Sequence, residues 1–397
     1  MLYIRGHKII KGYIGNTPVS HVGFGKSGLI KIKSENGGSD YPNNLIAKYT
    51  ANASGVLPTF NSGYQYTINE TEFNGIYTVE LFSDDDFTSC TFSGKTELLT
   101  VDYLKVTDKV TTMEKLFNGC TSLTKANTSN FDTSKVTNMI YIFSSCSQLT
   151  QLDVSNFDTS NVTNMRNMFR NCSQLTQLDV SNWNTSKVAD MNNIFSSCSQ
   201  LTQLDVSNWN TSKVADMNNM FSSCSRLTQL DVSNFDTSKV TNMRNMFSSC
   251  SQLTQLDVSN FDTSNVTSMR NMFNGCSQLT QLDVSNFDTS KVADMNYMFY
   301  NCSSLIQLDV SNFDTSKVAD MSSFIVNASV LQSFISCAIP VSFGASGTAL
   351  THDSLMSIIN NLATVTTTQT LTLGSTNLAK LSSEEKAIAT NKGWTLA

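Results

Sequence analysis

The middle of the chain repeats one pattern of apolar and polar positions with a period of 26 residues. Leu, Val, Met, Phe and Cys each return to a fixed place in this period. The cysteines mark the period most clearly and lie at Cys120, Cys146, Cys172, Cys198, Cys224, Cys250, Cys276 and Cys302. Because a single unit cannot bury its apolar side alone, this periodicity predicts stacked units that share one continuous core.

Each unit combines an extended segment with a segment of helical spacing. The run Leu149–Val154 alternates apolar and polar residues, which predicts a short strand with Leu152 and Val154 pointing inward. The run Asn156–Ser160 is rich in turn formers. The run Met165–Cys172 places its apolar residues at helical spacing, which predicts one or two helical turns. We therefore expect an α/β solenoid: a right-handed coil of roughly nine or ten turns, with one short parallel strand and one short helical turn per unit.

Composition divides the chain into four predicted parts. Residues 1–44 form an N-terminal β attachment segment that ends in a linker over 36–44, and 45–97 form a small β module that caps the solenoid. The solenoid itself occupies 98–335, and 336–397 form a C-terminal α/β cap.

Local signals locate the elements of the predicted cap. We expect a helix from about Asp353 to Leu362 and a strand over Thr370–Leu373. A second helix should start near Ser382, because Glu385 follows at the spacing of a capping box. Such a cap would cover the last open edge of the solenoid.

The charge balance argues against some classes of binding partner. The net charge is −6 and charged residues make up 15% of the sequence, which argues against nucleic acid and against an anionic membrane surface. No apolar run is long enough to span a membrane. The first residues lack the apolar core and cleavage site of a secretory signal peptide, so we expect no secretory export.

The repeat itself resembles a known family. Its pattern L-x-x-L-D-V-S-N-F-D-T-S-x-V-T-N-M-x-x-M-F-x-x-C, over about 98–335, is similar to the BspA-type leucine-rich repeats of bacterial surface proteins. It is close to the 26-residue variant in mycoplasma and lactic-acid-bacterial surface proteins. This resemblance implies a surface protein linked to adhesion.

The two ends of the chain resemble a different group of proteins. Residues Lys11–Ser20 look like short structural segments in virion proteins of Gram-positive phages, and Leu371–Leu378 with Lys392–Trp394 look like C-terminal caps of phage tail-associated proteins. These end matches are weaker than the repeat match. They imply that the repeats belong to a phage virion protein, which leaves its host by lysis and needs no signal peptide.

A row of polar residues on the outward strand face is the candidate ligand site. We expect this face to be the concave one. Its members are Gln151, Asp153, Asp179, Asp205, Asp231, Asp257, Asp283 and Asp309. Stacked carboxylates repel one another, so solvent cations, Ser and Thr hydrogen bonds or the row Lys187, Lys213, Lys239, Lys291 and Lys317 should offset the repulsion. The row either binds a ligand or Ca²⁺, or it is a solvated ladder that fixes register, and we favour the ladder.

Three further ladders are interpreted as structural. One Cys per unit, which follows Met and Phe on the apolar face, predicts buried reduced thiols instead of metal ligands or disulfides. The Asn row that includes Asn156 should bond the backbone of a neighbouring coil with buried amides. The aromatic row is mostly Phe with Trp183 and Trp209 in adjacent units; a carbohydrate platform is conceivable, but inward rings that fill the turn are favoured.

These observations favour binding over catalysis. The chain has 3 His, and neither a nucleophile elbow, a P-loop nor an HExxH motif occurs. We expect no cofactor and no metal. The predicted function is a non-enzymatic phage virion protein, either tail-associated or a capsid-surface fibre, that displays the solenoid on the virion surface for host recognition.

The partners follow from that interpretation. Other virion proteins would contact the N-terminal module, and a host-surface glycan or protein would contact the strand face. The sequence leaves open whether the chain forms a homo-oligomer. The alternatives are a bacterial cell-surface adhesin and a structural spacer that binds nothing.

Overall fold

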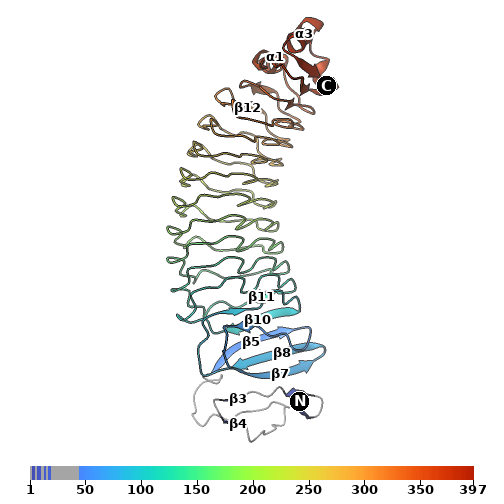
Figure 1. The fold of residues 1–397 in the computed structure, drawn as a ribbon. Helices are drawn as coiled ribbons and strands as arrows, with labels where there is room; N and C mark the ends of the chain where they lie inside the picture. Colours follow the sequence, from blue (N-terminus) through green and yellow to red (C-terminus); the bar gives the residue numbers. More distant parts are fainter. Residues whose placement is uncertain (1, 5–6, 10–12, 15–16, 19–43) are drawn as a thin grey trace.

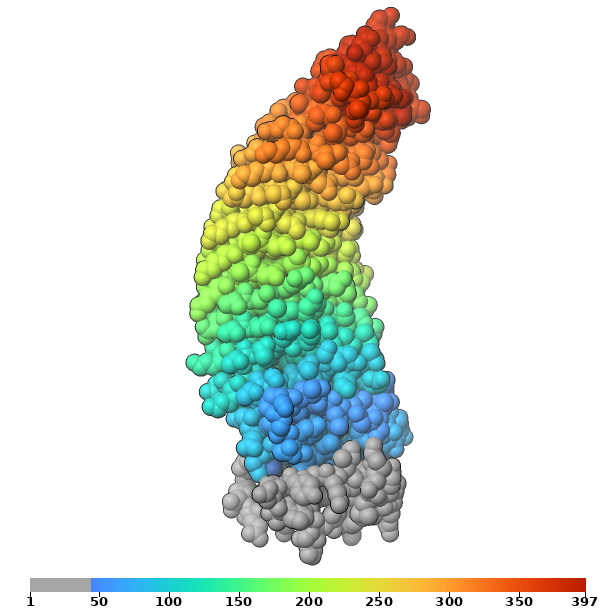
Figure 2. Space-filling view, viewed as in Figure 1, coloured from blue at the N-terminus to red at the C-terminus, as the bar shows by residue number. Residues whose placement is uncertain are grey.

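The computed structural model describes residues 2–4, 7–9, 13–14, 17–18 and 44–397 and shows a curved column (Figure 1). A β-sheet lies at one end, stacked turns follow, and the helices lie at the other end. The colours in the space-filling view change in bands across the column, so each turn occupies its own layer (Figure 2). One apolar core runs through the layers from Ile46 to Trp394.

The residues before the sheet include two short antiparallel pairs. The strand β1 (Leu2–Ile4) pairs with β2 (His7–Ile9), and β3 (Tyr13–Ile14) pairs with β4 (Thr17–Pro18). The linker expected over 36–44 lies outside the described residues, except for its last residue.

The N-terminal sheet has five strands in the order β11-β10-β5-β8-β7. Its members are β5 (Leu45–Ala51), β7 (Thr67–Phe73), β8 (Ile76–Phe82), β10 (Leu98–Leu104) and β11 (Lys125–Ala126). The hairpin between β7 and β8 turns at Asn74 and Gly75, whose φ angles of 52° and 78° suit a tight two-residue loop. A small separate pair joins β6 (Thr59–Phe60) to β9 (Cys90–Thr91).

The sheet passes directly into the stacked turns. The strand β10 pairs in parallel with β11, which belongs to the first turn of the repeat, and Lys125 then bridges to Gln151 in the next turn. A second position of the repeat bridges from turn to turn along the whole stack, from Thr112 and Asn138 through Asn164, Asp190 and Asp216 to Asp320. The repeat period of the sequence is therefore the length of one turn of the column.

The prediction of one strand in every unit is wrong for most turns. Beyond β11, the described turns contain a strand in this segment only near the end of the stack, where β12 (Gln307–Asp309) pairs in parallel with β13 (Ser333–Ile335). Elsewhere the contact between turns is a long backbone hydrogen bond, such as the 3.4 Å bond from Thr176 N to Thr150 O. The physical reason is that a parallel strand needs a ladder of backbone hydrogen bonds to its neighbour, and isolated long bonds in this segment do not form one.

The prediction of a helical turn in each unit is also wrong. In Met165–Cys172 alternate amides bond the next turn of the column, as Asn167 N does to Asn192 O at 2.9 Å. The amides between them bond three residues back, and Asn167 and Asn171 have φ angles of 56° and 62°. A left-handed residue cannot continue a right-handed helix. The array is therefore built of β bridges and loops, and the protein is mostly β and loop with few helices.

The inward positions of the units are confirmed. The repeated Leu, Val, Met, Phe and Cys side chains are buried, and Phe rings stack along the column. The rings of Phe169 and Phe195, for example, are parallel with centroids 5.8 Å apart. Each turn thus buries its apolar face against the turns before and after it.

The C-terminal end forms an α/β cap. It contains α1 (His352–Asn361), α2 (Gly374–Leu378), α3 (Ser383–Asn391) and a parallel sheet of β14 (Phe343–Gly344), β15 (Gln369–Thr372) and β16 (Trp394–Leu396). The first predicted helix corresponds to α1 and the predicted strand to β15. The capping box at the start of α3 is present, since Ser382 and Glu385 exchange both hydrogen bonds.

Candidate functional site

The predicted site residues all lie exposed along the column. The seven Asp side chains of the row occupy one position in seven successive turns, and Gln151 lies two residues before the first of them, Asp153. In each Asp-x-Ser unit the carboxylate accepts a hydrogen bond from the Ser amide two residues on, as Asp257 Oδ1 does from Ser259 N at 3.0 Å. The Ser259 hydroxyl donates to the same oxygen at 2.7 Å. The second carboxylate oxygen is left to face solvent or a ligand.

These local hydrogen bonds keep the carboxylates ionised. The Ser259 hydroxyl and then its amide hold the pKa of Asp257 below the usual Asp range. The same pair of donors from Ser285 lowers the pKa of Asp283, while the charge of Asp257 opposes that shift. Neighbouring carboxylates therefore repel one another, and Ser hydrogen bonds offset part of the repulsion.

The Lys row does not offset the Asp row. Lys187 Nζ donates to Asn161 Oδ1 at 2.8 Å, and Lys291 Nζ donates to Asn265 Oδ1 at 2.7 Å. Among the ion pairs of the described residues, none involves a member of the Asp row. The face that carries this row is thus negatively charged.

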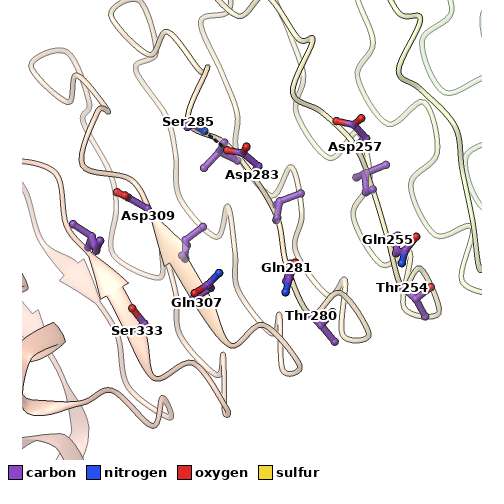
Figure 3. A pocket seen from close by; sticks show the side chains of 15 residues that line it. Thr254, Gln255, Asp257, Thr280, Gln281, Asp283, Ser285, Gln307, Asp309 and Ser333 are labelled. Atoms are coloured by element: carbon purple, nitrogen blue, oxygen red, sulfur yellow. Dashed lines mark hydrogen bonds between the residues drawn. The ribbon is translucent and has the colours of Figure 1, made fainter.

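Four turns near the C-terminal end of the array form an open pocket of about 670 Å³ on this face (Figure 3). Asp257, Asp283 and Asp309 lie in one line along it, with a Gln two residues before each of them. We call it the Gln/Asp pocket. Its lining is Thr254, Gln255, Leu256, Asp257, Thr280, Gln281, Leu282, Asp283, Val284, Ser285, Gln307, Leu308, Asp309, Ser333 and Ile335.

The pocket contains only part of the predicted set. Asp257, Asp283 and Asp309 line it, whereas Gln151, Asp153, Asp179, Asp205 and Asp231 lie on earlier turns outside it. Sequence reasoning missed Ser333 and Ile335, which belong to the turn after the last Asp of the row. The sequence did contain a signal for them: where the repeat would place an Asp after Asp309, the chain has Ile335, which pairs with Asp309 in the parallel register.

The cysteine ladder is confirmed as a row of buried free thiols. All 10 cysteines are free and buried. The eight thiols of the ladder, from Cys120 to Cys302, each donate to a Phe carbonyl of the preceding turn, as Cys198 Sγ does to Phe169 O at 3.2 Å. Burial raises the pKa of Cys250 and of Cys302 to about 12. Such thiols are protonated at neutral pH and are poor nucleophiles and metal ligands.

The aromatic row is confirmed as core. Trp183 and Trp209 are 3% and 2% exposed, so their faces offer no platform for a sugar. Six of the eight side chains in the Asn row bond backbone carbonyls of the preceding turn as expected, for example Asn260 Nδ2 to Ser233 O at 3.1 Å. The expected burial of this row is wrong, because Asn130 is half-buried and the other seven, Asn156 among them, are exposed.

The described residues show neither a metal-binding cluster nor a membrane-spanning helix. No group of three or more His, Cys, Asp or Glu side chains in this part of the chain is arranged to hold a metal ion. No helix there is both long and apolar enough to cross a bilayer.

The fold and the pocket define a protein of stacked 26-residue repeats with a polar exposed face. Residues 89–178, 176–256 and 227–337 match the family described as "Mycoplasma protein of unknown function, DUF285". These stretches span more than half of the chain, and the protein belongs to this family, which is related to the BspA-like repeat proteins. No curated protein and no solved structure matches the chain.

Proposed function

We propose that the protein is a non-enzymatic display protein whose repeats form a BspA-type leucine-rich-repeat solenoid and bind a host surface. The observation that carries this proposal is the Gln/Asp pocket. It gathers three Asp and three Gln side chains from adjacent turns into one open site on the exposed face. A regular stack of turns suits this role, because it presents a surface at a fixed distance from its attachment point.

The chemistry of the side chains supports binding over catalysis. Hydrogen bonds from Ser lower the pKa of Asp257 and Asp283, and burial raises the pKa of the Cys250 thiol. Catalytic acids and nucleophiles need the opposite shifts: a raised carboxyl pKa or a lowered thiol pKa. The carboxylates of the pocket are suited to accepting hydrogen bonds and attracting positive charge.

We place this display protein on a phage virion, attached through residues 1–44 and the module 45–97. The support is the resemblance of Leu371–Leu378 and Lys392–Trp394 to caps of phage tail-associated proteins. The alternative location is a bacterial cell surface, which the BspA-type resemblance alone would favour. Labelling purified virions with an antibody to the full chain separates the two: tail or capsid labelling supports the virion, and unlabelled particles overturn it.

Binding is tested with the full-length protein on intact cells. The fluorescently labelled chain should bind lactic-acid bacteria or mycoplasma cells in a saturable way. The variant Gln281→Arg with Asp283→Arg places two bulky cations in the Gln/Asp pocket and should reduce binding at least about tenfold. The matched control is Gln177→Arg with Asp179→Arg, the same change on a turn outside the pocket.

The outcomes of this experiment separate the candidate functions. Loss of binding in the Gln281/Asp283 variant alone supports recognition through the pocket. Equal loss in both variants assigns recognition to the whole face instead of the pocket. Saturable binding by neither the native chain nor the variants overturns the adhesion proposal and leaves the structural spacer.

A further inference from the structure

The Gln/Asp pocket has two chemically different ends. Toward the N-terminal side lie Asp257 and Asp283, and the lining residues include no Lys, Arg or His. Toward the C-terminal side, Ile335 pairs with Asp309 in the register of β12 and β13 and is 48% exposed. The line of carboxylates therefore ends in an exposed apolar side chain.

A second line of side chains on the same face changes in the same way. Thr254 and Thr280 line the pocket, and the next turn carries Ile306 at this position. Ile306 N bonds Thr280 O at 3.3 Å, and Ser333 N bonds Ile306 O at 3.3 Å, so Ile306 lies between two lining residues. Its side chain is 50% exposed. Two polar positions of an otherwise regular face thus become apolar at the same end of the pocket.

We propose that the Gln/Asp pocket binds an extended polypeptide segment of a partner protein, with Lys or Arg side chains at the carboxylates and a large apolar side chain on Ile306 and Ile335. The negative line of unpaired Asp side chains complements a basic segment. Ile306 and Ile335, exposed on neighbouring turns at one end of the pocket, offer apolar contacts to that end of the segment only, which fixes its direction along the column. This inference rests on the proposed function, because it names the ligand class of the same site.

The lining favours a peptide over a sugar chain. Glycan sites commonly offer an aromatic face for a sugar ring to stack on, and no aromatic side chain lines the pocket. Trp183 and Trp209, the two indoles of the repeats, are buried in the core. An acidic site with an apolar end matches the mixed side chains of a polypeptide better than a uniform chain of hydroxyl groups.

The experiment measures fluorescence anisotropy of labelled peptides with the full-length protein at an ionic strength of about 0.15 M. The first probe is a lysine-rich peptide that ends in two leucines. The second has glutamate in place of each lysine, and the third keeps the lysines but ends in two serines. We expect the first probe to bind most tightly, the third more weakly and the second not at all. Added salt should weaken binding of the first probe.

A charge variant with a matched control assigns the binding to the pocket. Replacing Asp257, Asp283 and Asp309 with Asn should weaken the first probe at least about tenfold. Asn preserves the local turn, because Asn184 Oδ1 already accepts from Ser186 N and Oγ at 3.1 and 2.7 Å. The control variant makes the same change on the same row outside the pocket, at Asp153, Asp179 and Asp205.

An apolar variant tests the anchor point separately. Ile306→Thr with Ile335→Thr keeps branched side chains of similar shape and removes most of the exposed apolar surface. It should abolish the preference for the leucine-ended probe over the serine-ended probe.

Four results overturn the inference. Three of them are binding of the glutamate probe as tightly as the lysine probe, equal effects of the two Asn variants, and an unchanged leucine preference in the Thr variant. A fourth is binding of neutral oligosaccharides or of chitosan fragments with no binding of any peptide, which assigns the site to a glycan. Saturable binding to cells would in that case still support the proposed function, so the two proposals fail by different results.

Discussion

The indole ring of Trp209 lies almost parallel to that of Trp183 in the preceding turn, with ring centroids 6.2 Å apart and an interplanar angle of 5°. Trp209 Nε1 also donates to Val180 O at 3.2 Å. Phe157 stacks on the other side of Trp183 with centroids 6.4 Å apart. This aromatic column accepts Phe or Trp at each turn, and Trp adds a hydrogen bond between turns.

Substitutions at Trp209 should separate ring packing from the hydrogen bond. Trp209→Phe keeps a ring in the column but leaves Val180 O without its indole donor, so we expect a cost of about 1 kcal/mol. Trp209→Ala removes a buried ring and should cost about 3–5 kcal/mol. Thermal and guanidinium unfolding followed by circular dichroism measures both. Equal costs for the two variants would contradict the packing argument.

Ser223 should tolerate glycine but not a β-branched residue. Its φ angle is 61°, in the left-handed region, and Gly275 holds the same position of another turn with a φ of 72°. We expect Ser223→Gly to leave stability unchanged or slightly higher, and Ser223→Val to lower it by about 1–2 kcal/mol. The melting temperatures of the two variants test this. As a control, Gln203, which is exposed and is not among the left-handed residues, should accept Val at a smaller cost.

The buried positions could be predicted from the sequence because the core of a stacked array depends on side-chain identity at repeated positions. Met165 and Cys172 are buried as expected, whatever backbone conformation carries them. The capping box of Ser382 and Glu385 was predictable because it is a local interaction. These features depend on spacing along the chain and not on its path between the buried residues.

The backbone of each unit could not be predicted from spacing alone. Apolar residues at helical spacing fit a helix, yet Asn167 adopts a left-handed conformation and its amide bonds the next turn. The signal was present at two positions: Asn recurs at that of Asn167 in several turns, and Asn or Gly recurs at that of Asn171, as in Gly275, since these types tolerate such a conformation. The pocket was harder to predict, because it depends on the departure at Ile335 from a pattern that was interpreted as uniform.

Acid should destabilise the fold through the Asp-x-Ser turns. Hydrogen bonds from Ser hold the pKa of Asp231, Asp257 and Asp283 below the usual range. A folded pKa below the unfolded value means that the stabilisation is complete above about pH 3.9 and is lost as the pH falls through the folded pKa. The melting temperature should therefore drop at acidic pH. Replacing these three Asp residues with Asn should make that drop shallower, and an unchanged drop would assign it to other groups.

The thiols should be unreactive in the folded protein. The 10 cysteines are buried, and burial raises the pKa of Cys120 and of Cys337 to about 12. A thiol reagent such as dithionitrobenzoate should release almost no chromophore from the native chain at neutral pH and react with every cysteine in guanidinium chloride. Rapid labelling of the native chain would show that the stack opens locally, and partial labelling in denaturant would indicate oxidised pairs.

Removing one whole turn should leave both ends of the column intact. Each turn bonds only to the turns before and after it, as Thr163 N does to Thr137 O and Ala189 N does to Thr163 O. Deletion of 201–226 removes one period and joins Gln200 to Leu227, so every remaining bridge keeps its partner type. We expect a cooperative unfolding transition and unchanged binding at the Gln/Asp pocket, with a slightly lower melting temperature because one interface is lost.

The control deletes half as many residues, 201–213, which brings polar positions into the core and should prevent folding. Native behaviour of the half-period deletion, or collapse of the full-period one, would show that the turns are not equivalent layers.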